Sequence, residues 1–342
     1  MSSATGRTVS VFFVASPLHY LAARSVAHHF EHNTRCIVVA YQHGARKLIV
    51  EQHWDGVAYA PWPRFDPLPG TFGRHRRLLA NLHEVAAIVG ACDTLLLHSP
   101  VFDTEAVNYF LRALPRLCGA NTMHARILPD GLLNIVRHPL SLPRRAAQYL
   151  RKLRRLSTPL LDYWCFGGDR IGSEAPFVDR IYTLSGFPHD YPLHKVVTLP
   201  PLVSEGEAKA VNAALIVGQP LVAIGALSSA DHDVICARIA DWLKTRGIDK
   251  VMYKTHPRDP AHELRVPGAE VLEMAESLEN HMASHAYRVV IGINSTALYL
   301  ARQIYGPTVP VLSFGNDKVR FKNPDQRERA IHLMDSLGIE RL

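Results

Sequence analysis

The sequence predicts an α/β protein of two units, each built on a parallel sheet that helices cover on both faces. Two observations support this prediction: short apolar segments alternate with helical segments in both halves of the chain, and a proline-rich segment separates the two series. Such alternation is typical of parallel sheets buried on both faces. The 342 residues are enough for two domains of ordinary size.

In the first half, the periodicity predicts the following strands and helices. Strands are expected at residues 9–15, 36–41, 57–60, 94–98, 125–128 and 180–184, the last of these closing the sheet. Helices are expected at 18–30, 45–53, 74–89, 104–117 and 144–155. This half is Rossmann-like, but no Gly-x-Gly-x-x-Gly fingerprint follows its first strand, so a nicotinamide or flavin dinucleotide is not expected.

The proline-rich segment 186–201 is interpreted as a linker. The predicted first domain therefore spans residues 1–188, and the predicted second, Rossmann-like domain spans residues 189–342. In the second domain, strands are expected at 213–218, 251–254, 269–272, 288–293 and 308–312, the last again closing the sheet. Helices are expected at 230–245, 277–284 and 325–337, with another that starts at Ala297.

Composition and cysteine usage favour a cytoplasmic protein. Hydrophobic residues make up 47% of the chain and charged residues 20%, yet no apolar run reaches the roughly 20 residues of a membrane span. Residues 1–8 are too polar for a signal peptide. The five cysteines are scattered and lack zinc-site spacing, which is typical of thiols in a reducing compartment.

The net charge of +7 favours acidic small molecules, polyanions or an anionic membrane as partners. Part of this charge lies in the predicted helix Arg144–Arg155, where leucines are interspersed among the basic residues. A solvated helix face is the ordinary explanation, and peripheral contact with the inner face of the cell membrane is the alternative. Nucleic acid is not an expected partner, because the basic segments lack interleaved aromatic residues.

Two polar turns of the second domain follow predicted strands, where ligands of open α/β sheets bind. A helix that starts at Ala297 would present unpaired backbone N–H groups, which can form a phosphate-binding site. The ordinary alternative is that one turn caps a helix and the other is a simple His-Pro turn. The candidate phosphate-binding residues lie in or beside these turns: Lys254, His256, Pro257, Arg258, Asn294, Ser295 and Thr296.

Four short motifs of the sequence match the pattern of a known family. The second half contains Val-Gly-Gln-Pro-Leu at 217–221, Lys-Thr-His-Pro-Arg at 254–258 and Asn-Ser-Thr-Ala-Leu at 294–298, and the first half contains Asp-Gly at 130–131. Over roughly 215–300 the sequence resembles bacterial sialyltransferases of the lipooligosaccharide and polysialic acid kind, which use CMP-activated sialic acid. The resemblance implies a GT-B fold, in which two Rossmann-like domains face each other across a cleft and a terminal helix can cross back.

The resemblance also implies roles for individual residues. Asp130 would be the general base that takes the proton of the acceptor hydroxyl. His256 would donate to the departing phosphate oxygen, while Ser295 and Thr296 hold the phosphate. Direct displacement would invert the anomeric configuration. The chain departs from the family pattern at Pro129, where the family has an acidic residue, and in having Ser-Thr in place of Ser-Ser.

Further site residues are expected around these motifs. Gly218 and Gln219 would let the backbone approach the cytosine, and Glu279 would accept a hydrogen bond from the ribose or base, unless it is a solvated helix carboxylate. Asp130 could also be a simple turn residue, since Pro-Asp-Gly is a strong turn signal. The residues expected near the acceptor are Ser16, His19, Gly131, Asn134 and Arg137.

The expected partners are a CMP-activated sugar and a bacterial surface glycan, lipid-linked or not, of lipopolysaccharide or capsule. No cofactor is expected, and no divalent metal, since no Asp-x-Asp cluster lies near the motifs. Other donors remain open, namely CMP-Kdo, another nonulosonic acid or a UDP-sugar. Two further alternatives are pyruvyl transfer from phosphoenolpyruvate and a non-catalytic polyanion- or membrane-binding protein.

Overall fold

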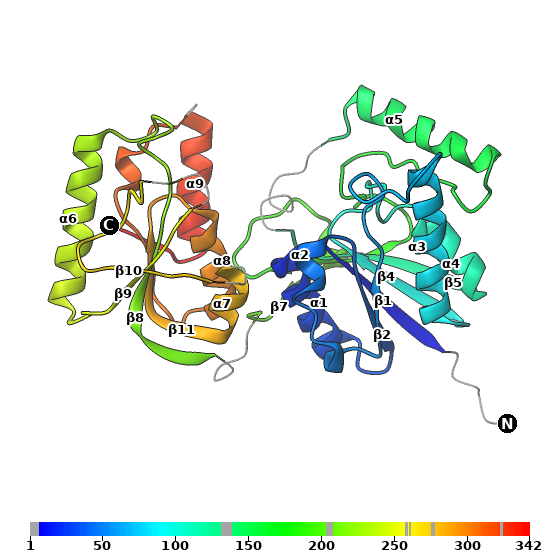
Figure 1. The fold of residues 1–342 in the computed structure, drawn as a ribbon, viewed down its shortest axis with the longest axis horizontal. Helices are drawn as coiled ribbons and strands as arrows, with labels where there is room; N and C mark the ends of the chain where they lie inside the picture. Colours follow the sequence, from blue (N-terminus) through cyan, green and yellow to red (C-terminus); the bar gives the residue numbers. More distant parts are fainter. Residues whose placement is uncertain are drawn as a thin grey trace. The chain divides into compact units, whose positions relative to one another are not determined.

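The computed structural model describes residues 7–130, 139–202, 208–256, 259, 261–274, 278–321 and 324–342. The chain divides into two compact units (Figure 1). The first unit comprises the residues up to Thr183 together with His189–Leu199, and the second comprises Leu184–Pro188 and Pro200–Leu342. Each unit contains one sheet, which confirms the predicted α/β class with two separate sheets.

The sheet of the first unit has seven strands in the order β3-β2-β1-β4-β5-β6-β7. The pairings from β3 to β6 are parallel. The strands are β1 (Thr8–Val14), β2 (Arg35–Ala40), β3 (Gly56–Tyr59), β4 (Thr94–Ser99), β5 (Thr122–Ile127), β6 (Val178–Leu184) and β7 (Val196–Leu199). Their runs of apolar residues, buried in the centre of the sheet, are those expected of strands covered on both faces.

The helices of the first unit are α1 (Pro17–Phe30), α2 (His43–Arg46), α3 (Gly73–Val89), α4 (Phe110–Cys118) and α5 (Leu142–Lys152). Single 3₁₀ turns are η1 (Glu51–His53), η3 (Leu153–Leu156) and η4 (Leu193–Lys195).

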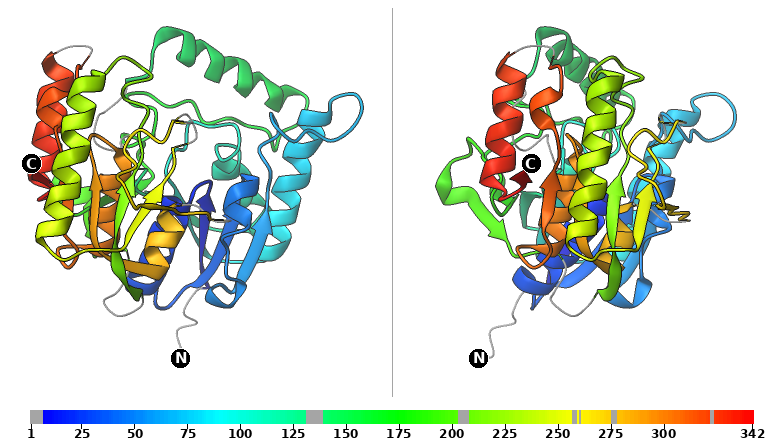
Figure 2. Two further views of the ribbon diagram at one scale, coloured as in Figure 1. Left: turned by 60° about the vertical axis from the view of Figure 1, so that its left-hand side comes forward. Right: turned by 90° about the vertical axis from the view of Figure 1, so that its left-hand side faces the viewer.

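The core of the first unit lies between its sheet and its helices. Because side chains alternate along a strand, Val11 and Phe13 of β1 join the core that α3 and α4 complete. Phe12 faces the other way, toward Trp54, which also contacts Tyr20 of α1. Helix α5 lies at the periphery of this unit (Figures 1 and 2).

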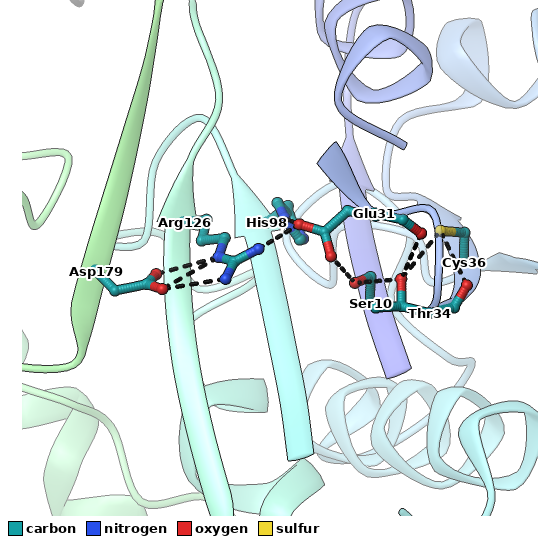
Figure 3. Close-up of polar contacts among 7 residues, drawn as sticks. All are labelled: Ser10, Glu31, Thr34, Cys36, His98, Arg126 and Asp179. Carbon is teal, nitrogen blue, oxygen red and sulfur yellow. Dashed lines mark hydrogen bonds and ion pairs between the residues drawn. The ribbon is translucent and has the colours of Figure 1, made fainter. Parts of the chain in front are cut away.

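A buried ionic network ties the carboxyl end of α1 to the middle of the sheet (Figure 3). Glu31, 4% exposed, accepts from Ser10 Oγ at 3.0 Å, pairs with Arg126 and has His98 Nε2 3.5 Å away. Arg126 also pairs with Asp179 at 3.1 Å. Burial by itself would raise the pKa of Glu31, but hydrogen bonding and charge from His98, with the charge of Arg126, lower it overall. The network therefore keeps Glu31 ionised inside the protein.

The sheet of the second unit has six strands in the order β10-β9-β8-β11-β12-β13, and all five pairings are parallel. The strands are β8 (Lys209–Val217), β9 (Val251–Lys254), β10 (Glu270–Val271), β11 (His285–Gly292), β12 (Val311–Ser313) and β13 (Glu340–Arg341). The helices are α6 (Ser229–Thr245), α7 (Leu278–Ser284), α8 (Thr296–Tyr305) and α9 (Pro324–Ser336), with a 3₁₀ turn η5 (Asn316–Lys318). Helix α6 packs through Ile235 and Ile239 against Ile216 and Ile291 of the sheet, while α7 and α8 pack against each other.

Several predicted boundaries were wrong. The helix expected at 45–53 is replaced by α2 and η1, because the Val50 N–H donates to Tyr20 Oη rather than to a helical carbonyl. The helix expected at 104–117 begins only at Phe110, since the Asn108 side chain bonds to Phe102 and Trp164 carbonyls and holds an irregular turn.

Two strands were missed. β7 lies within the segment predicted as a linker, so the strand at 180–184 does not close the first sheet. β13 likewise follows the strand expected to close the second sheet. Both are short, at four and two residues, and too short to give a clear alternation in the sequence.

Candidate functional site

A pocket of about 470 Å³ lies at the carboxyl edge of the second unit's sheet. It is formed by the turns that follow β8, β9 and β11, which are neighbours in the sheet. Parallel strands bring their carboxyl ends to one edge, so turns distant in sequence meet there. The predicted residues that line it are Gly218, Gln219, Lys254, His256, Asn294, Ser295 and Thr296. Further lining residues, not predicted, are Val217, Pro220, Thr255, Leu278 and Ala297.

One wall of the pocket is the amino end of α8. Ser295 is the N-cap, and its Oγ accepts from the Ala297 N–H at 3.3 Å. The Ser295 hydroxyl can still donate its hydrogen, and the hydroxyl of Thr296, an exposed residue, can do the same. These hydroxyls lie at the positive dipole end of α8 and form a set of donors suited to an anion.

Gln219 joins two of the turns. Its Oε1 accepts from the Asn294 N–H at 2.8 Å, and Asn294 Oδ1 lies 3.4 Å from Tyr299 Oη. The side chain of Gln219 therefore fixes the turn before α8 as well as lining the pocket. The sequence indicated only a backbone role for this position.

The turn that carries His256 is held from beneath by a pair of residues that the sequence analysis missed. The fully buried Tyr253 donates from its hydroxyl to Asp259 Oδ2 at 2.9 Å, and the Asp259 N–H donates to the His256 carbonyl at 2.9 Å. Burial, followed by the Asp259 carboxylate, raises the pKa of Tyr253, so this hydroxyl stays protonated. Lys254 Nζ donates to the Thr255 carbonyl at 3.2 Å at the pocket wall.

Gly218 is packed so tightly that a side chain does not fit. A Cβ at this position would lie 2.8 Å from Tyr253 Cζ and 3.0 Å from the Lys254 carbonyl oxygen. The glycine thus lets the turn after β8 lie directly against the strand that leads to His256. This close approach, rather than an unusual backbone angle, is the physical requirement for glycine here.

Replacing Gly218 by Ala should lower the free energy of unfolding by about 1–3 kcal/mol, because the added methyl group overpacks the site. Affinity for a phosphate-bearing ligand should fall in parallel, since the His256 turn must shift. Urea unfolding and calorimetry measure the two effects. Gly44→Ala is the matched control, because a Cβ there would meet no atom within 4 Å beyond its chain neighbours. Unchanged stability and ligand affinity in Gly218→Ala would contradict this account.

Other predicted donor-site residues are not placed in the pocket wall. Glu279 lies half-buried in the first turn of α7, next to the lining residue Leu278, but does not itself line the pocket. Pro257 and Arg258 lie outside the described residues.

In the first unit, the structure brings His19 and Asp130 together. His19 Nε2 lies 2.7 Å from Asp130 Oδ1, although the two residues are 111 positions apart. The Ala15 N–H donates to His19 Nδ1 at 3.3 Å, which assigns the imidazole hydrogen to Nε2, where it is donated to the carboxylate. The ring is nearly buried, whereas the Asp130 side chain is 25% exposed. Asp130 is thus presented to solvent with His19 behind it.

The local sequence explains this placement. Ser16 is the N-cap of α1, and its Oγ accepts from the His19 N–H at 3.3 Å, so the Ser-Pro-Leu-His turn directs His19 back over the end of β1. Asp130 follows β5, and both β1 and β5 pair with β4. Gly131, Asn134 and Arg137 lie outside the described residues.

Both ring nitrogens of His19 have partners, so His19 orients the carboxylate and is not placed to take a proton from another group. The carboxylate of Asp130 is the more exposed member of the pair. The pair can therefore act as a positioned base, with the histidine as its fixed donor.

The described part of the chain offers neither a metal-binding cluster nor a membrane-spanning helix. Among these residues, no group of three or more His, Cys, Asp or Glu side chains could hold a metal ion. No helix in the same residues is long and apolar enough to cross a membrane.

Comparison with known proteins gives one family match, over part of the chain. The matching model is that of the alpha-2,8-polysialyltransferase (POLYST) family, over residues 171–312. This range contains the pocket turns of His256 and Ser295, whereas His19 and Asp130 precede it. The search of curated proteins gave no match.

Several solved structures are similar over nearly the whole chain at low identity. The kitacinnamycin glycosyltransferase is 12% identical with a TM-score of 0.48, covering 98% of this chain and 86% of its own. The Polygonum tinctorium UDP-glucosyltransferase that glucosylates indoxyl is 12% identical with a TM-score of 0.48, covering 99% and 86%. A UDP-N-acetylglucosamine 2-epimerase is 12% identical with a TM-score of 0.45, covering 96% and 86%.

Proposed function

We propose that the protein is an inverting glycosyltransferase that moves sialic acid, or a related nonulosonic acid, from its CMP donor to a hydroxyl of a bacterial surface glycan. The main support is that the family match and the pocket involve the same segment of the chain. The polysialyltransferase match spans the residues whose turns line the pocket, and those turns supply donors suited to a phosphate.

The pocket has the chemistry that a CMP group requires. A volume of about 470 Å³ is in the range of nucleotide-sized ligands. In the proposal, the phosphate lies at the amino end of α8, where Ser295, Thr296 and backbone N–H groups donate to it. The ammonium group of Lys254 adds positive charge at the same wall.

His256 is proposed to assist departure of the phosphate. Negative charge grows on the phosphate oxygen as the bond to the anomeric carbon breaks, and a donor fixed beforehand stabilises that charge. The Tyr253–Asp259 pair supports this role, because it holds the His256 turn without filling the pocket.

Asp130 is proposed to take the proton of the acceptor hydroxyl while His19 holds the carboxylate in place. Direct attack on the anomeric carbon would invert its configuration. For this reaction the first unit, which contains Asp130, would provide the acceptor site, and the second unit, which contains the pocket, would provide the donor site. The reaction is proposed to need no metal, because α8, Lys254 and His256 offset the phosphate charge.

The proposed place of action is the cytoplasm, including the inner face of the cell membrane, where a lipid-linked acceptor would be presented. The proposed partners are the CMP-activated sugar and the glycan acceptor.

The test is release of CMP from CMP-sialic acid, with and without a galactoside acceptor, in the presence of EDTA. The wild type should turn over the donor without metal. His256→Ala should lower kcat by about 10²–10³-fold, the usual loss when one preorganised donor is removed. His83→Ala is the control, because His83 is exposed on α3 in the other unit.

Two other outcomes of this assay would change the proposed function. Turnover of CMP-Kdo or a UDP-sugar in place of CMP-sialic acid would correct the donor but retain the reaction class. Neither CMP release nor calorimetric binding of CMP would show that the proposed function is wrong.

A further inference from the structure

Helix α5 presents an apolar stripe to solvent. Leu142, Tyr149, Leu150 and Leu153 are between 57% and 78% exposed. With the exposed Ala146, they recur at spacings of four, three, one and three residues, which places them on one face of a helix. The stripe runs onto η3, which contains Leu153 and where Leu156 is 78% exposed. Such a stripe ordinarily faces a protein core.

The opposite, inward face of α5 is polar. Gln148 is 1% exposed. Arg151 donates to Tyr163 Oη at 3.1 Å, and Arg154 pairs with Glu105 and donates to Tyr109 Oη at 3.0 Å. Hydrogen bonds and ion pairs therefore hold the helix to its unit, and the leucines are not used for that purpose. The polarity of α5 is reversed relative to an ordinary surface helix.

The helix is also strongly basic. Residues 142–156 contain six Lys and Arg residues and no Asp or Glu. Arg151 and Arg154 point inward, but Arg144, Arg145 and Arg155 are exposed. Exposed apolar side chains bordered by basic ones are the features of helices that lie in the interface of an anionic bilayer.

We propose that α5 and η3 form a docking surface for an anionic lipid bilayer. Leu142, Tyr149, Leu150 and Leu153 enter the boundary between headgroups and acyl chains, while the exposed arginines contact lipid phosphates. A second copy of this chain is a poorer occupant, because residues 142–156 contain six basic and no acidic residues, so pairing this surface with itself would bring like charges together. The carboxylates of Glu105 and Asp162 already pair with Arg154 and Arg155.

This inference goes beyond the proposed reaction and depends only on α5. It also alters the expectation for Arg144–Arg155: the exposed arginines border the contact, whereas the leucines and Tyr149 form its centre. The four apolar side chains belong neither to the His19–Asp130 pair nor to the pocket lining, so binding and catalysis can be tested with separate variants.

The test is co-sedimentation of the full chain with vesicles of phosphatidylcholine alone or with 30% phosphatidylglycerol. The wild type should bind the anionic vesicles, bind the neutral ones at least about tenfold more weakly, and dissociate as salt is raised. The quadruple variant Leu142→Ser, Tyr149→Ser, Leu150→Ser, Leu153→Ser should lose about tenfold or more of the affinity for anionic vesicles. The matched control is Ile224→Ser with Val234→Ser, exposed apolar residues of the second unit.

Circular dichroism and an unchanged thermal unfolding midpoint show that the quadruple variant is folded. Binding of this variant to anionic vesicles as tightly as the wild type would overturn the proposal. A wild type that does not bind vesicles but forms a dimer that the four substitutions dissociate would also overturn it, because the stripe would then be an interface between copies. Loss of vesicle binding with an unchanged unfolding midpoint supports the proposal whatever the sugar donor is.

Discussion

Replacing Asp130 by Asn should nearly abolish sugar transfer while leaving CMP binding intact. The carboxylate is the proposed base, and an amide of the same shape cannot take the acceptor proton, so kcat should fall by about 10²–10⁴-fold. CMP affinity should not change, because the pocket is built from residues of the second unit alone. Steady-state kinetics and calorimetry measure the two quantities. Glu84→Gln, at an exposed carboxylate on α3, is the control.

Variants of His19 test whether its hydrogen bond positions the Asp130 carboxylate for this role. Since its Nε2 donates to Asp130, His19→Gln keeps a donor in reach, whereas His19→Ala removes it. The glutamine variant should retain more activity than the alanine variant at equal thermal stability. Equal activity in both variants would mean that His19 only fills space. Full activity in Asp130→Asn would exclude Asp130 as the base.

Replacing Arg126 by Met should lower the free energy of unfolding by about 3–5 kcal/mol, the usual cost of removing one partner of a buried ion pair. Glu31 would lose its guanidinium partner inside the protein. Of the two groups that lower its pKa by charge, only the buried His98 would remain, and burial lowers the pKa of that imidazole. Urea unfolding followed by tryptophan fluorescence measures the loss.

Two variants control this experiment. Arg238→Met, at an exposed arginine of α6, should change stability by no more than about 0.5 kcal/mol. Arg126→Met combined with Glu31→Gln should be less destabilised than Arg126→Met alone, because the stranded charge is gone. A loss of unfolding free energy below about 1 kcal/mol in Arg126→Met would show that water or a rearranged side chain stabilises the Glu31 charge instead.

Much of the fold could be predicted because the strands are apolar runs of clear length. β1, β2 and β4 were recognised in this way, and so were helices α3 and α6, whose apolar residues recur at helical spacing. The failures arose where a distant side chain decides the backbone. Tyr20 takes the Val50 N–H and interrupts the helix expected at 45–53, a contact that no local pattern reveals.

The candidate site likewise contains residues that could be predicted from the sequence and residues that could not. His256 and Ser295 could be predicted because each follows a strand, and strand ends of a parallel sheet converge. The His19–Asp130 pair joins residues 111 positions apart, so its geometry could not be read from either motif. The Tyr253–Asp259 support was missed for a different reason: a buried tyrosine in a strand gives no sign in the sequence that its hydroxyl holds a loop. Likewise, the periodicity of α5 defines a stripe but not the direction it faces.

Helix α1 connects two features that otherwise have nothing in common. Its first turn contains His19, and Glu31 follows its last turn, so about 18 Å of helix separates the donor to Asp130 from the ionic network of the sheet. A helix of this length transmits a shift at one end to the other. Acid that protonates Glu31 and loosens this end would therefore also disturb the orientation of Asp130, through the same helix.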